Sequence, residues 1–369
     1  LEGVDQQEHA VDHAQDALHL AAEVGVAGGV DDVDAGVLPG DGGVLGQDGD
    51  AALALEGVRV EGALLHHLAA AEDLPWDQLE DNLTALARRY LNQAFEVEGY
   101  TLRFTTRSLL EAAVKYGRAI AHVARMYRHL ADTASDRPFE LEVSVDETDT
   151  PTTHAQHLYI ARELRRLRVH WVSLAPRYIG RFEKGVDYIG DLDAFENDFA
   201  VHAAIARVYG PYKLSLHSGS DKLSIYTDFA RLTQGRFHVK TAGTSYLEAL
   251  RVVARHDADL FREIVRFSRG RFETDRATYH IAATLDASPP PEAVDGVGPL
   301  EAAYLNADNG RQILHVSFGS VLTDARLGPA IHALLASEPA THRELLRIHF
   351  GRHLAALLRG LPDSALRGQ

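Results

Sequence analysis

Apolar and polar positions alternate with two different periods along the chain, and these periods predict its secondary structure. Apolar residues recur at helical spacing near 77–93 and 107–133. In the second of these segments the residues expected on one buried face are Leu109, Ala113, Tyr116 and Ile120. After residue 133 the pattern changes to short apolar runs separated by amphipathic segments, which is typical of an α/β protein.

Five of the short apolar runs are predicted strands. They are Phe139–Val145, Val169–Leu174, Tyr212–Leu216, Phe237–Lys240 and Ile313–Ser317. The amphipathic segments predict helices at 154–167, 191–208, 222–234, 244–256 and 258–270. Strands separated by single helices pair in parallel through right-handed crossovers. The pattern therefore favours a β/α barrel of the TIM type or a doubly wound sheet.

The end of the chain is predicted to be helical and to follow a loop. The prolines of Pro289–Pro291 predict a loop within Ala287–Asp295. Residues 328–360 read as two helices joined near Glu338–Thr341. We therefore expect no strand after the last run given above.

The first 75 residues differ in composition from the rest of the chain. They hold 16 acidic residues and one basic residue, Arg59, for a net charge of −15, while the other 294 residues hold 37 acidic and 36 basic residues. Residues 1–75 also contain no aromatic residue, serine or threonine. Few bulky apolar residues and a one-sign charge disfavour a packed core, so we expect residues 1–75 to be a poorly ordered acidic segment. Residues 76–369 are expected to form the catalytic domain.

The ten residue types found in 1–75 are the set encoded by codons that begin with G or C. Such a set arises when a GC-rich gene is read on its complementary strand. We therefore interpret residues 1–75 as a gene-model artefact, and Leu1 in place of Met as the mark of an incomplete reading frame. A genuine acidic tail is the alternative.

Composition also limits the kind of protein. No apolar run reaches the ~18–20 residues that cross a bilayer, and the first residues lack the order of a signal peptide, so we expect a cytoplasmic enzyme without a membrane partner. The near-neutral remainder offers no basic patch for nucleic acid. Because the chain has no cysteine, any metal must be held by His, Asp or Glu.

Polar residues cluster where four predicted strands end. The clusters are Asp146–Thr150, Ala175–Tyr178, His217–Lys222 and Lys240–Ser245. In parallel β/α folds the carboxyl ends of the strands meet at one edge. Four such clusters in succession predict a single site.

Each acidic or imidazole group in these clusters has a structural alternative. Asp146 and Glu147 suit a general acid or base, but they also suit the N-terminal cap of the helix at 154–167. His217 and His238 lie on adjacent predicted strands, and two imidazoles with a carboxylate are a common ligand set for a catalytic divalent metal. A buried histidine with a purely structural role is the alternative.

The remaining candidates are suited to bind an anionic substrate. Ser218 and Thr244 lie in small-residue turns at helix starts, which either receive an anion or simply cap the helix. The chain has only five Lys against 32 Arg. Lys222 and Lys240 in the clusters therefore suggest that the site needs an ammonium group. The alternative is that these two lysines lie on the surface by chance. Arg177 is the candidate for bidentate carboxylate binding. Such a site favours a metal bound to an anionic, hydroxyl-rich molecule such as a sugar acid.

Longer motifs at these positions resemble one known family. They are Glu142–Thr152, Arg181–Tyr188, Ser215–Lys222, Phe237–Tyr246 and His315–Leu322. Together they are similar to the bacterial tagaturonate/fructuronate epimerases from about residue 80 to the C-terminus. The resemblance implies a metal-dependent cytoplasmic enzyme of hexuronate catabolism that interconverts D-tagaturonate and D-fructuronate. It also implies that Glu147 is an acid/base residue and that His217 and His238 hold a divalent metal cation.

The resemblance leaves the chemical route and the state of this chain open. The inverted carbon lies β to the ketone, so retro-aldol cleavage with re-addition and metal-assisted proton transfer are both compatible with it. Nothing in residues 1–75 matches the N-terminal portion of the family, so we expect a barrel that is incomplete at its N-terminus and weak or absent turnover. The alternatives are another divalent-metal barrel isomerase or aldolase acting on a sugar acid, and a non-catalytic fragment.

Overall fold

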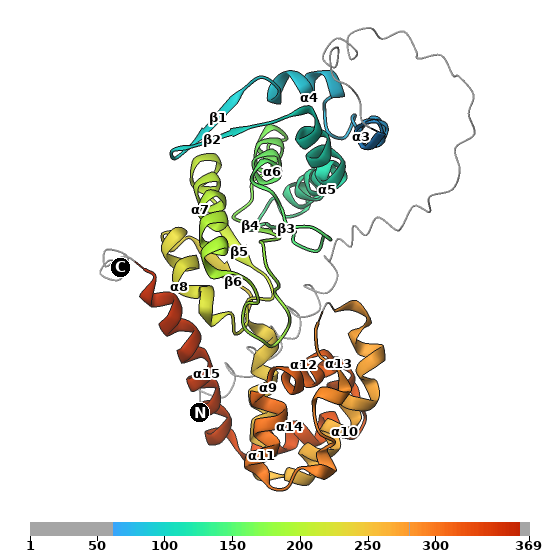
Figure 1. Ribbon diagram of the computed structural model, residues 1–369, viewed down its shortest axis with the longest axis vertical. Helices are drawn as coiled ribbons and strands as arrows, with labels where there is room; N and C mark the ends of the chain where they lie inside the picture. The colour runs from blue at the N-terminus through green and yellow to red at the C-terminus, as the bar shows by residue number, and fades with distance from the viewer. Residues whose placement is uncertain (1–61, 280, 362–369) are drawn as a thin grey trace, which may run out of the picture.

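The computed structural model describes residues 62–279 and 281–361 (Figure 1). Its helices are α3 (Gly62–Glu72), α4 (Leu83–Tyr90), α5 (Thr106–Thr133), α6 (His154–Arg166), α7 (Leu192–Tyr209), α8 (Leu223–Leu232), α9 (Ser245–His256), α10 (Ala258–Asp275), α11 (Val297–Glu301), α12 (Asp308–Val316), α13 (Phe318–Thr323), α14 (Leu327–Ser337) and α15 (Pro339–Arg359). Its strands are β1 (Ala94–Val97), β2 (Tyr100–Arg103), β3 (Glu142–Val145), β4 (Ser173–Pro176), β5 (Lys213–Leu216) and β6 (Phe237–Val239).

The first described elements cover one end of the sheet region. Helix α5 begins at a capping box in which the Thr105 and Ser108 side chains each accept the other's backbone N–H, and its predicted buried face is confirmed. The helix predicted near 77–93 is shorter, because Asn82 caps the start of α4. The hairpin β1–β2 was not predicted. It turns at Glu98 and Gly99, both with positive φ, which suits the twist of a two-residue hairpin.

Part of the predicted acidic segment is described. Helix α3 packs on α5, and Ala71 and Leu74 are buried in the same core as α5. Residues 1–61 lie outside the described residues. The boundary at residue 75 therefore stays a prediction.

The central sheet consists of four parallel strands in the order β3-β4-β5-β6. The helices α6, α7 and α8 connect successive strands, which confirms the prediction of parallel β/α units. The sheet is not closed in the described part of the chain, so a TIM barrel is not confirmed. None of the described helices combines the length and apolar character that a membrane crossing needs.

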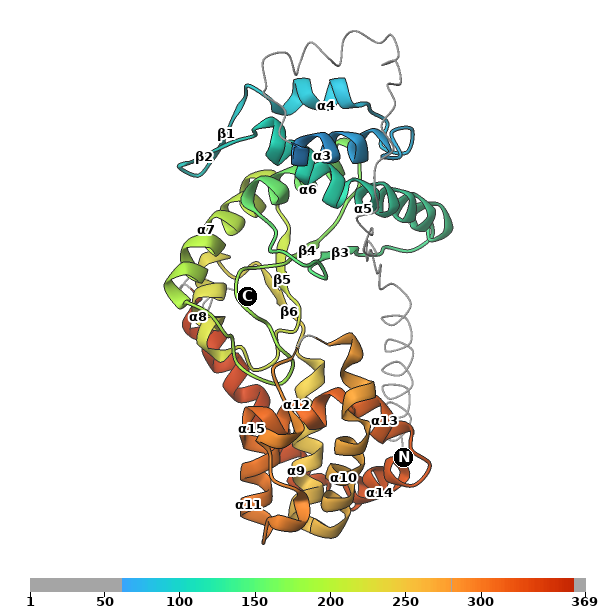
Figure 2. The same cartoon turned by 45° about the vertical axis from the view of Figure 1, so that its right-hand side comes forward.

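The two faces of the sheet differ in chemistry because side chains alternate along a strand. Val143, Leu174 and Leu214 are buried among the helices, and α7 and α8 lie to one side of the strands in both views (Figures 1 and 2). The alternate positions are mostly small or polar, and they include Glu142 and Ser215. Register pairs Glu142 with Ser173 and Ser215 with His238, so these residues share one face.

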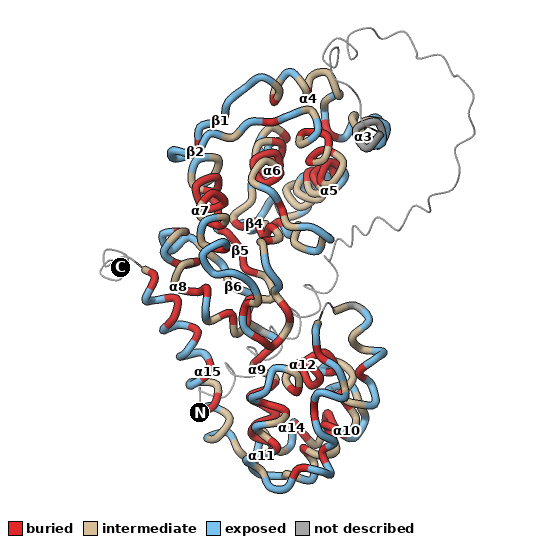
Figure 3. The backbone as a smooth tube through the Cα atoms, viewed as in Figure 1, coloured by how far each residue is buried: buried red, intermediate tan, exposed pale blue. Residues whose placement is uncertain are grey.

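The C-terminal helices form a second layer with its own core. This core includes Phe261, Ile264, Leu300, Tyr304 and Leu314. Buried residues are frequent along α9, α10 and α12 (Figure 3). Helix α15 runs from this layer back to α8, and α14 and α15 confirm the two predicted terminal helices joined at Glu338.

The prediction of a strand at Ile313–Ser317 is wrong. Residues 308–316 form the helix α12, in which Ile313, Leu314 and Val316 are buried. A short continuous apolar run suits a buried helix as well as a buried strand, so periodicity alone cannot separate them. The loop predicted around Pro289–Pro291 is confirmed, with only short 3₁₀ turns on either side.

Candidate functional site

Glu142, at the start of β3, joins the two predicted metal ligands. Its Oε1 lies 2.7 Å from His217 Nε2, and its Oε2 lies 2.7 Å from His238 Nδ1. The Ser215 hydroxyl donates to Oε2 at 2.9 Å and lies 2.9 Å from His238 Nδ1. Strands β3, β5 and β6, with His217 directly after β5, therefore bring these four side chains together, as the strand-end argument predicts for His217 and His238.

Asp146 extends this cluster on the other side of His217. Its Oδ1 lies 3.3 Å from His217 Nδ1 and accepts a hydrogen bond from Ser144 at 2.5 Å. Both ring nitrogens of His217 thus face a carboxylate. Burial alone would lower the pKa of His217, but hydrogen bonds to Asp146 and Glu142 raise it to about 9.

The same contacts keep the carboxyl groups ionised. Burial alone would raise the pKa of Glu142, but hydrogen bonds from His217, His238 and the nearby serines hold it well below its usual range. The pKa of Asp146 is also lowered, by a smaller amount. Burial alone would raise it, but His217 and Ser144 lower it. The cluster is therefore a set of charged hydrogen-bonded groups, with His238 about half exposed to solvent.

The loop after β3 does not cap the next helix with its acidic residues. The N-cap of α6 is Thr153, which forms a capping box with Gln156. The capping alternative for Asp146 and Glu147 is therefore excluded. Glu147 is exposed and makes no hydrogen bond or ion pair with another described residue.

Two lysines lie in the electrostatic surroundings of this loop. Burial lowers the pKa of Lys184; Asp146 and Glu147 act in the opposite direction, while Lys240 lowers it further. Lys240 itself is exposed just beyond β6. Lys184 was not among the predicted site residues, although it lies in one of the family-like motifs.

Arg177 and Lys115 form a second cationic pair beside the same loop. The backbone of Arg177 pairs with Thr152 through hydrogen bonds of 2.8 and 3.1 Å. Lys115 Nζ, from α5, donates to the Thr150 carbonyl oxygen at 2.8 Å. Burial and, to a smaller extent, the Arg177 charge lower the pKa of Lys115 to about 8, although Asp149 opposes them. Sequence reasoning missed Lys115 because it lies on a helix outside the strand-end clusters.

Two of the predicted binding residues take other positions. Lys222 is fully buried, and its Nζ donates to the carbonyl oxygens of Glu183, Val186 and Ser220. Thr244 is buried as well, with its hydroxyl 3.2 Å from His349 Nε2 on α15. Lys222 thus joins the loop after β5 to residues 183–186, and Thr244 joins the loop after β6 to α15.

Ser218 lies directly after His217 in a left-handed turn. Its φ is 48°, and the following Gly219 leaves no room for a Cβ against Leu216 and Val239. Ser218 is partly exposed at the edge where His217 lies. Its role in substrate binding stays a prediction.

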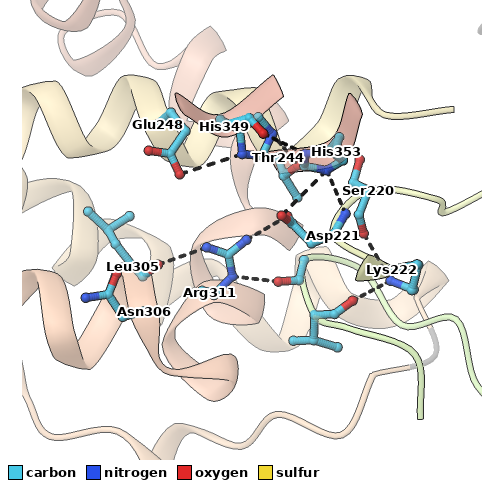
Figure 4. A network of polar contacts seen from close by, with 12 residues as sticks. Ser220, Asp221, Lys222, Thr244, Glu248, Leu305, Asn306, Arg311, His349 and His353 are labelled. Carbon is cyan, nitrogen blue, oxygen red and sulfur yellow. Dashed lines mark hydrogen bonds and ion pairs between the residues drawn. The ribbon is translucent and has the colours of Figure 1, made fainter. Parts of the chain in front are cut away.

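A polar network joins this loop to the helical layer (Figure 4). Arg311 of α12 contacts Asp221 at 2.8 Å, and His353 Nε2 of α15 accepts the Asp221 backbone N–H at 3.0 Å. Arg311 also donates to the carbonyl oxygens of Gly185 and Leu305. The loop bearing Ser218 and Lys222 is therefore fixed from two directions.

The donor set around Glu142 is of the kind that binds a divalent metal. Two imidazoles and a carboxylate suit Zn²⁺ and related ions. Their spacing is wider than in a compact site, because His217 and His238 approach opposite oxygens of Glu142. Among the described residues, ligand atoms within 4.8 Å of one another occur in two other groups, His154–Asp198–His202 and Asp221–His349–His353.

Glu142 and Ser215 were the central residues that sequence reasoning missed. A signal was present in Glu142-Val143-Ser144-Val145, where polar and apolar residues alternate in a strand expected to be buried on both faces. The alternation indicates one polar face. It does not by itself tell which distant residue that face contacts.

Comparison with known proteins shows that these residues lie within a match to one protein family. Residues 69–357 match the sequence model of the family described as tagaturonate epimerase, UxaE. The tagaturonate/fructuronate epimerase of Thermotoga maritima is 46% identical over 271 residues, which are 73% of this chain and 55% of that protein. The chain thus spans about half the length of this curated relative.

Solved structures give the same result at the level of the fold. The native crystal structure of fructuronate-tagaturonate epimerase UxaE from Cohnella laeviribosi superposes with a TM-score of 0.73 at 35% identity, covering 83% of this chain and 61% of that chain. The same enzyme complexed with two glycerols superposes with a TM-score of 0.70 at 33% identity, covering 81% and 67%.

Proposed function

Because the chain belongs to the tagaturonate epimerase family, we propose that it forms the C-terminal part of an enzyme that interconverts D-tagaturonate and D-fructuronate. The observation that carries the proposal is the convergence of His217, His238 and Glu142 on one polar face of a parallel sheet. This convergence lies within the family match of residues 69–357. The product and substrate differ at one hydroxyl-bearing carbon.

We propose that the four strands are part of a β/α barrel. Strand order β3-β4-β5-β6 follows the chain, with helices α7 and α8 to one side and small or polar residues on the other face. A barrel interior carries its functional groups in this way. The solved relative is longer than this chain, which covers 61% of it. The expected cytoplasmic location stays a prediction.

His217, His238 and Glu142 are the residues that would hold a divalent cation. When bound, such an ion supplies a Lewis acid that polarises a carbonyl or hydroxyl oxygen. Asp146 keeps the ring of His217 oriented from its other nitrogen, as second-sphere carboxylates commonly do. Metal affinity measured on His217→Ala against His129→Ala, an exposed control on α5, tests this assignment.

The cations near the loop would bind the uronate carboxylate. Lys184, Lys240 and Arg177 lie around the Asp146–Pro151 loop. Ser218 offers a hydroxyl beside His217 for a substrate hydroxyl. We leave Lys222 and Thr244 out of the binding set, because their polar atoms are engaged inside the protein.

Glu147 would act as the acid/base residue. In a retro-aldol route it takes the proton of the hydroxyl on the carbon to be inverted, and the adjacent C–C bond breaks to an aldehyde and an enediolate. After the aldehyde turns its other face, the bond re-forms and Glu147 returns the proton. In a direct route Glu147 takes the proton bound to that carbon instead, and a proton from solvent is delivered to the opposite face of the carbon to invert it. Solvent deuterium would enter at that carbon in the direct route only.

Turnover of tagaturonate, followed by NMR, tests the proposal. We expect Glu147→Gln to lower the rate by at least about 100-fold, whereas Glu140→Gln, at an exposed position in the same region, keeps it. We expect the 369-residue chain to turn over more slowly than a full-length relative, because its described sheet is open. Equal rates for Glu147→Gln and Glu140→Gln would contradict the role of Glu147.

A further inference from the structure

A histidine-rich cluster lies between α6 and α7, the helices that connect β3 to β5. His154 is the first residue of α6, and Asp198 and His202 lie one turn apart on α7. His154 Nε2 is 2.9 Å from Asp198 Oδ1, and His202 Nε2 is 3.5 Å from Asp198 Oδ2. The three ligand atoms lie within 4.8 Å of one another.

Two atoms of this cluster are buried without a hydrogen-bond partner. His202 is completely buried, and neither its Nε2 nor Oδ2 of Asp198 makes a hydrogen bond to the described residues. A buried polar atom without a partner costs about 1–3 kcal/mol, so native proteins usually satisfy such atoms with a group or an ion. Here the two atoms face each other at 3.5 Å.

The other ring nitrogen of His202, Nδ1, contacts a second histidine. Its Nδ1 lies 2.8 Å from Nδ1 of His157, and His157 Nε2 lies 2.7 Å from the Tyr212 hydroxyl. When His202 Nδ1–H donates to His157, the Nε2 lone pair of His202 faces Asp198. Metal-binding histidines are commonly oriented by such a second hydrogen bond.

We propose that His154, Asp198 and His202 bind a transition-metal dication of the Zn²⁺ type, at a site separate from Glu142, His217 and His238. Two imidazoles and one carboxylate are suitable ligands for such an ion. His154 and Asp198 are partly exposed, at 30% and 21% of their side-chain surface, so the ion has access to water as a fourth ligand. The site joins α6 to α7.

The second compact group is a poorer candidate. Asp221 already pairs with Arg311 at 2.8 Å, and His353 Nε2 accepts the Asp221 backbone N–H. An ion there would have to displace both contacts and approach a guanidinium. The group therefore serves as an internal comparison.

A bound ion would steady the loop that carries the proposed acid/base residue. His154 begins α6 directly after this loop, which contains Asp146 and Glu147. The hydroxyl of Thr152, at the end of the loop, accepts a hydrogen bond from the backbone N–H of Arg177. The ion would thus affect the site by fixing the position of the loop that carries Glu147, without contacting the substrate.

Zn²⁺ titration of the full chain against a competing chelator tests the proposal. The titration is done on His217→Ala/His238→Ala, which lacks the other proposed ligands. We expect this variant to bind one Zn²⁺. Adding His154→Ala should weaken that binding by at least about tenfold, and adding His129→Ala should leave it unchanged. Asp198→Asn, which keeps the side-chain shape, should act like His154→Ala.

The outcomes separate this inference from the proposed function. If His217→Ala/His238→Ala binds no Zn²⁺, or if His154→Ala and Asp198→Asn bind as tightly as their parent, the inference is overturned. If the wild type binds one ion that only His154→Ala and Asp198→Asn lose, the inference stands and the metal assignment at Glu142 fails. Circular dichroism of each variant confirms that it is folded, and Co²⁺ absorption bands reporting tetrahedral coordination give a second readout.

Discussion

At the residue scale, the cluster around Glu142 depends on one carboxylate that bridges two histidines from different strands. Each imidazole uses one Glu142 oxygen, and Ser215 shares the second oxygen with His238. Removing the charge while keeping the shape would leave both rings without their common partner. This makes Glu142 the most informative single position in the proposed site.

We expect Glu142→Gln to weaken divalent-metal binding at this site by at least about tenfold, because the amide offers a neutral oxygen in place of a carboxylate. Calorimetric titration in the His154→Ala background, which removes the second proposed site, measures the change. Glu140→Gln is the matched control. Unchanged affinity in Glu142→Gln would show that Glu142 is not a ligand.

His315 on α12 predicts a pH dependence of stability. Burial lowers its pKa to about 4, aided by Lys184, Arg311 and Lys222. Between pH 6.5 and pH 4 the unfolded chain takes up a proton at this residue and the folded chain does not. The free energy of unfolding should therefore fall as the pH falls through this range, by up to about 3 kcal/mol from this residue.

Urea unfolding at a series of pH values tests this prediction. His315→Gln should show a smaller loss of stability between pH 6.5 and pH 4 than the wild type. His129→Gln, at an exposed position on α5, should keep the wild-type profile. Parallel profiles for the wild type and His315→Gln would contradict the prediction.

At the element scale, helix periodicity predicted most of the long helices, and short apolar runs were ambiguous. Residues 107–133, 191–208 and 258–270 are helical as expected. Ile313–Ser317 was misread because it is a short, continuously buried run, which suits a helix as well as a strand. The close packing of α12 on the preceding turn depends on Gly310, where a Cβ would meet the backbone of Ala303 and Tyr304.

We expect Gly310→Ala to destabilise the protein by about 1–3 kcal/mol, since the backbone of the neighbouring turn must move to admit the methyl group. The matched control is Gly351→Ala on α15, where a Cβ meets nothing within 4 Å. That substitution should stabilise by up to about 1 kcal/mol through helix propensity. Urea midpoints measure both, and a neutral Gly310→Ala would show that α12 packs less tightly.

At the scale of the whole molecule, the sheet and the helical layer are joined by charged contacts between distant segments. The Arg311–Asp221 pair links α12 to the loop after β5, and both side chains are nearly buried, at 11% and 12% exposure. Helix α15 adds the contact of His353 with the same aspartate. The loop carrying His217 and Ser218 therefore depends on the C-terminal helices.

We expect Arg311→Met to cost about 3–5 kcal/mol of stability, because it leaves Asp221 buried without its partner. Arg347→Met removes the partner of Glu344 in an exposed pair on α15 and should change stability by less than about 1 kcal/mol. Chemical unfolding compares the two. Similar small losses for both would mean that the Arg311 contact does not join the layers.

Features that depend on neighbours along the chain could be predicted from the amino-acid sequence alone. Helical and strand periods fixed α5 through α10 and the parallel β/α order, and long motifs identified the family. The placement of His217 and His238 at adjacent strand ends followed from the rule that parallel strands end at one edge.

Only the tertiary structure decided which polar groups meet. Glu142 on β3 contacts His217 after β5 and His238 on β6, Lys222 donates to carbonyl oxygens of residues 183 and 186, and Thr244 faces His349 on α15. A sequence pattern gives the face of an element on which a residue lies. The partner it finds there depends on how distant elements pack, because hydrogen bonds form over about 3 Å between residues that are tens of positions apart in the chain.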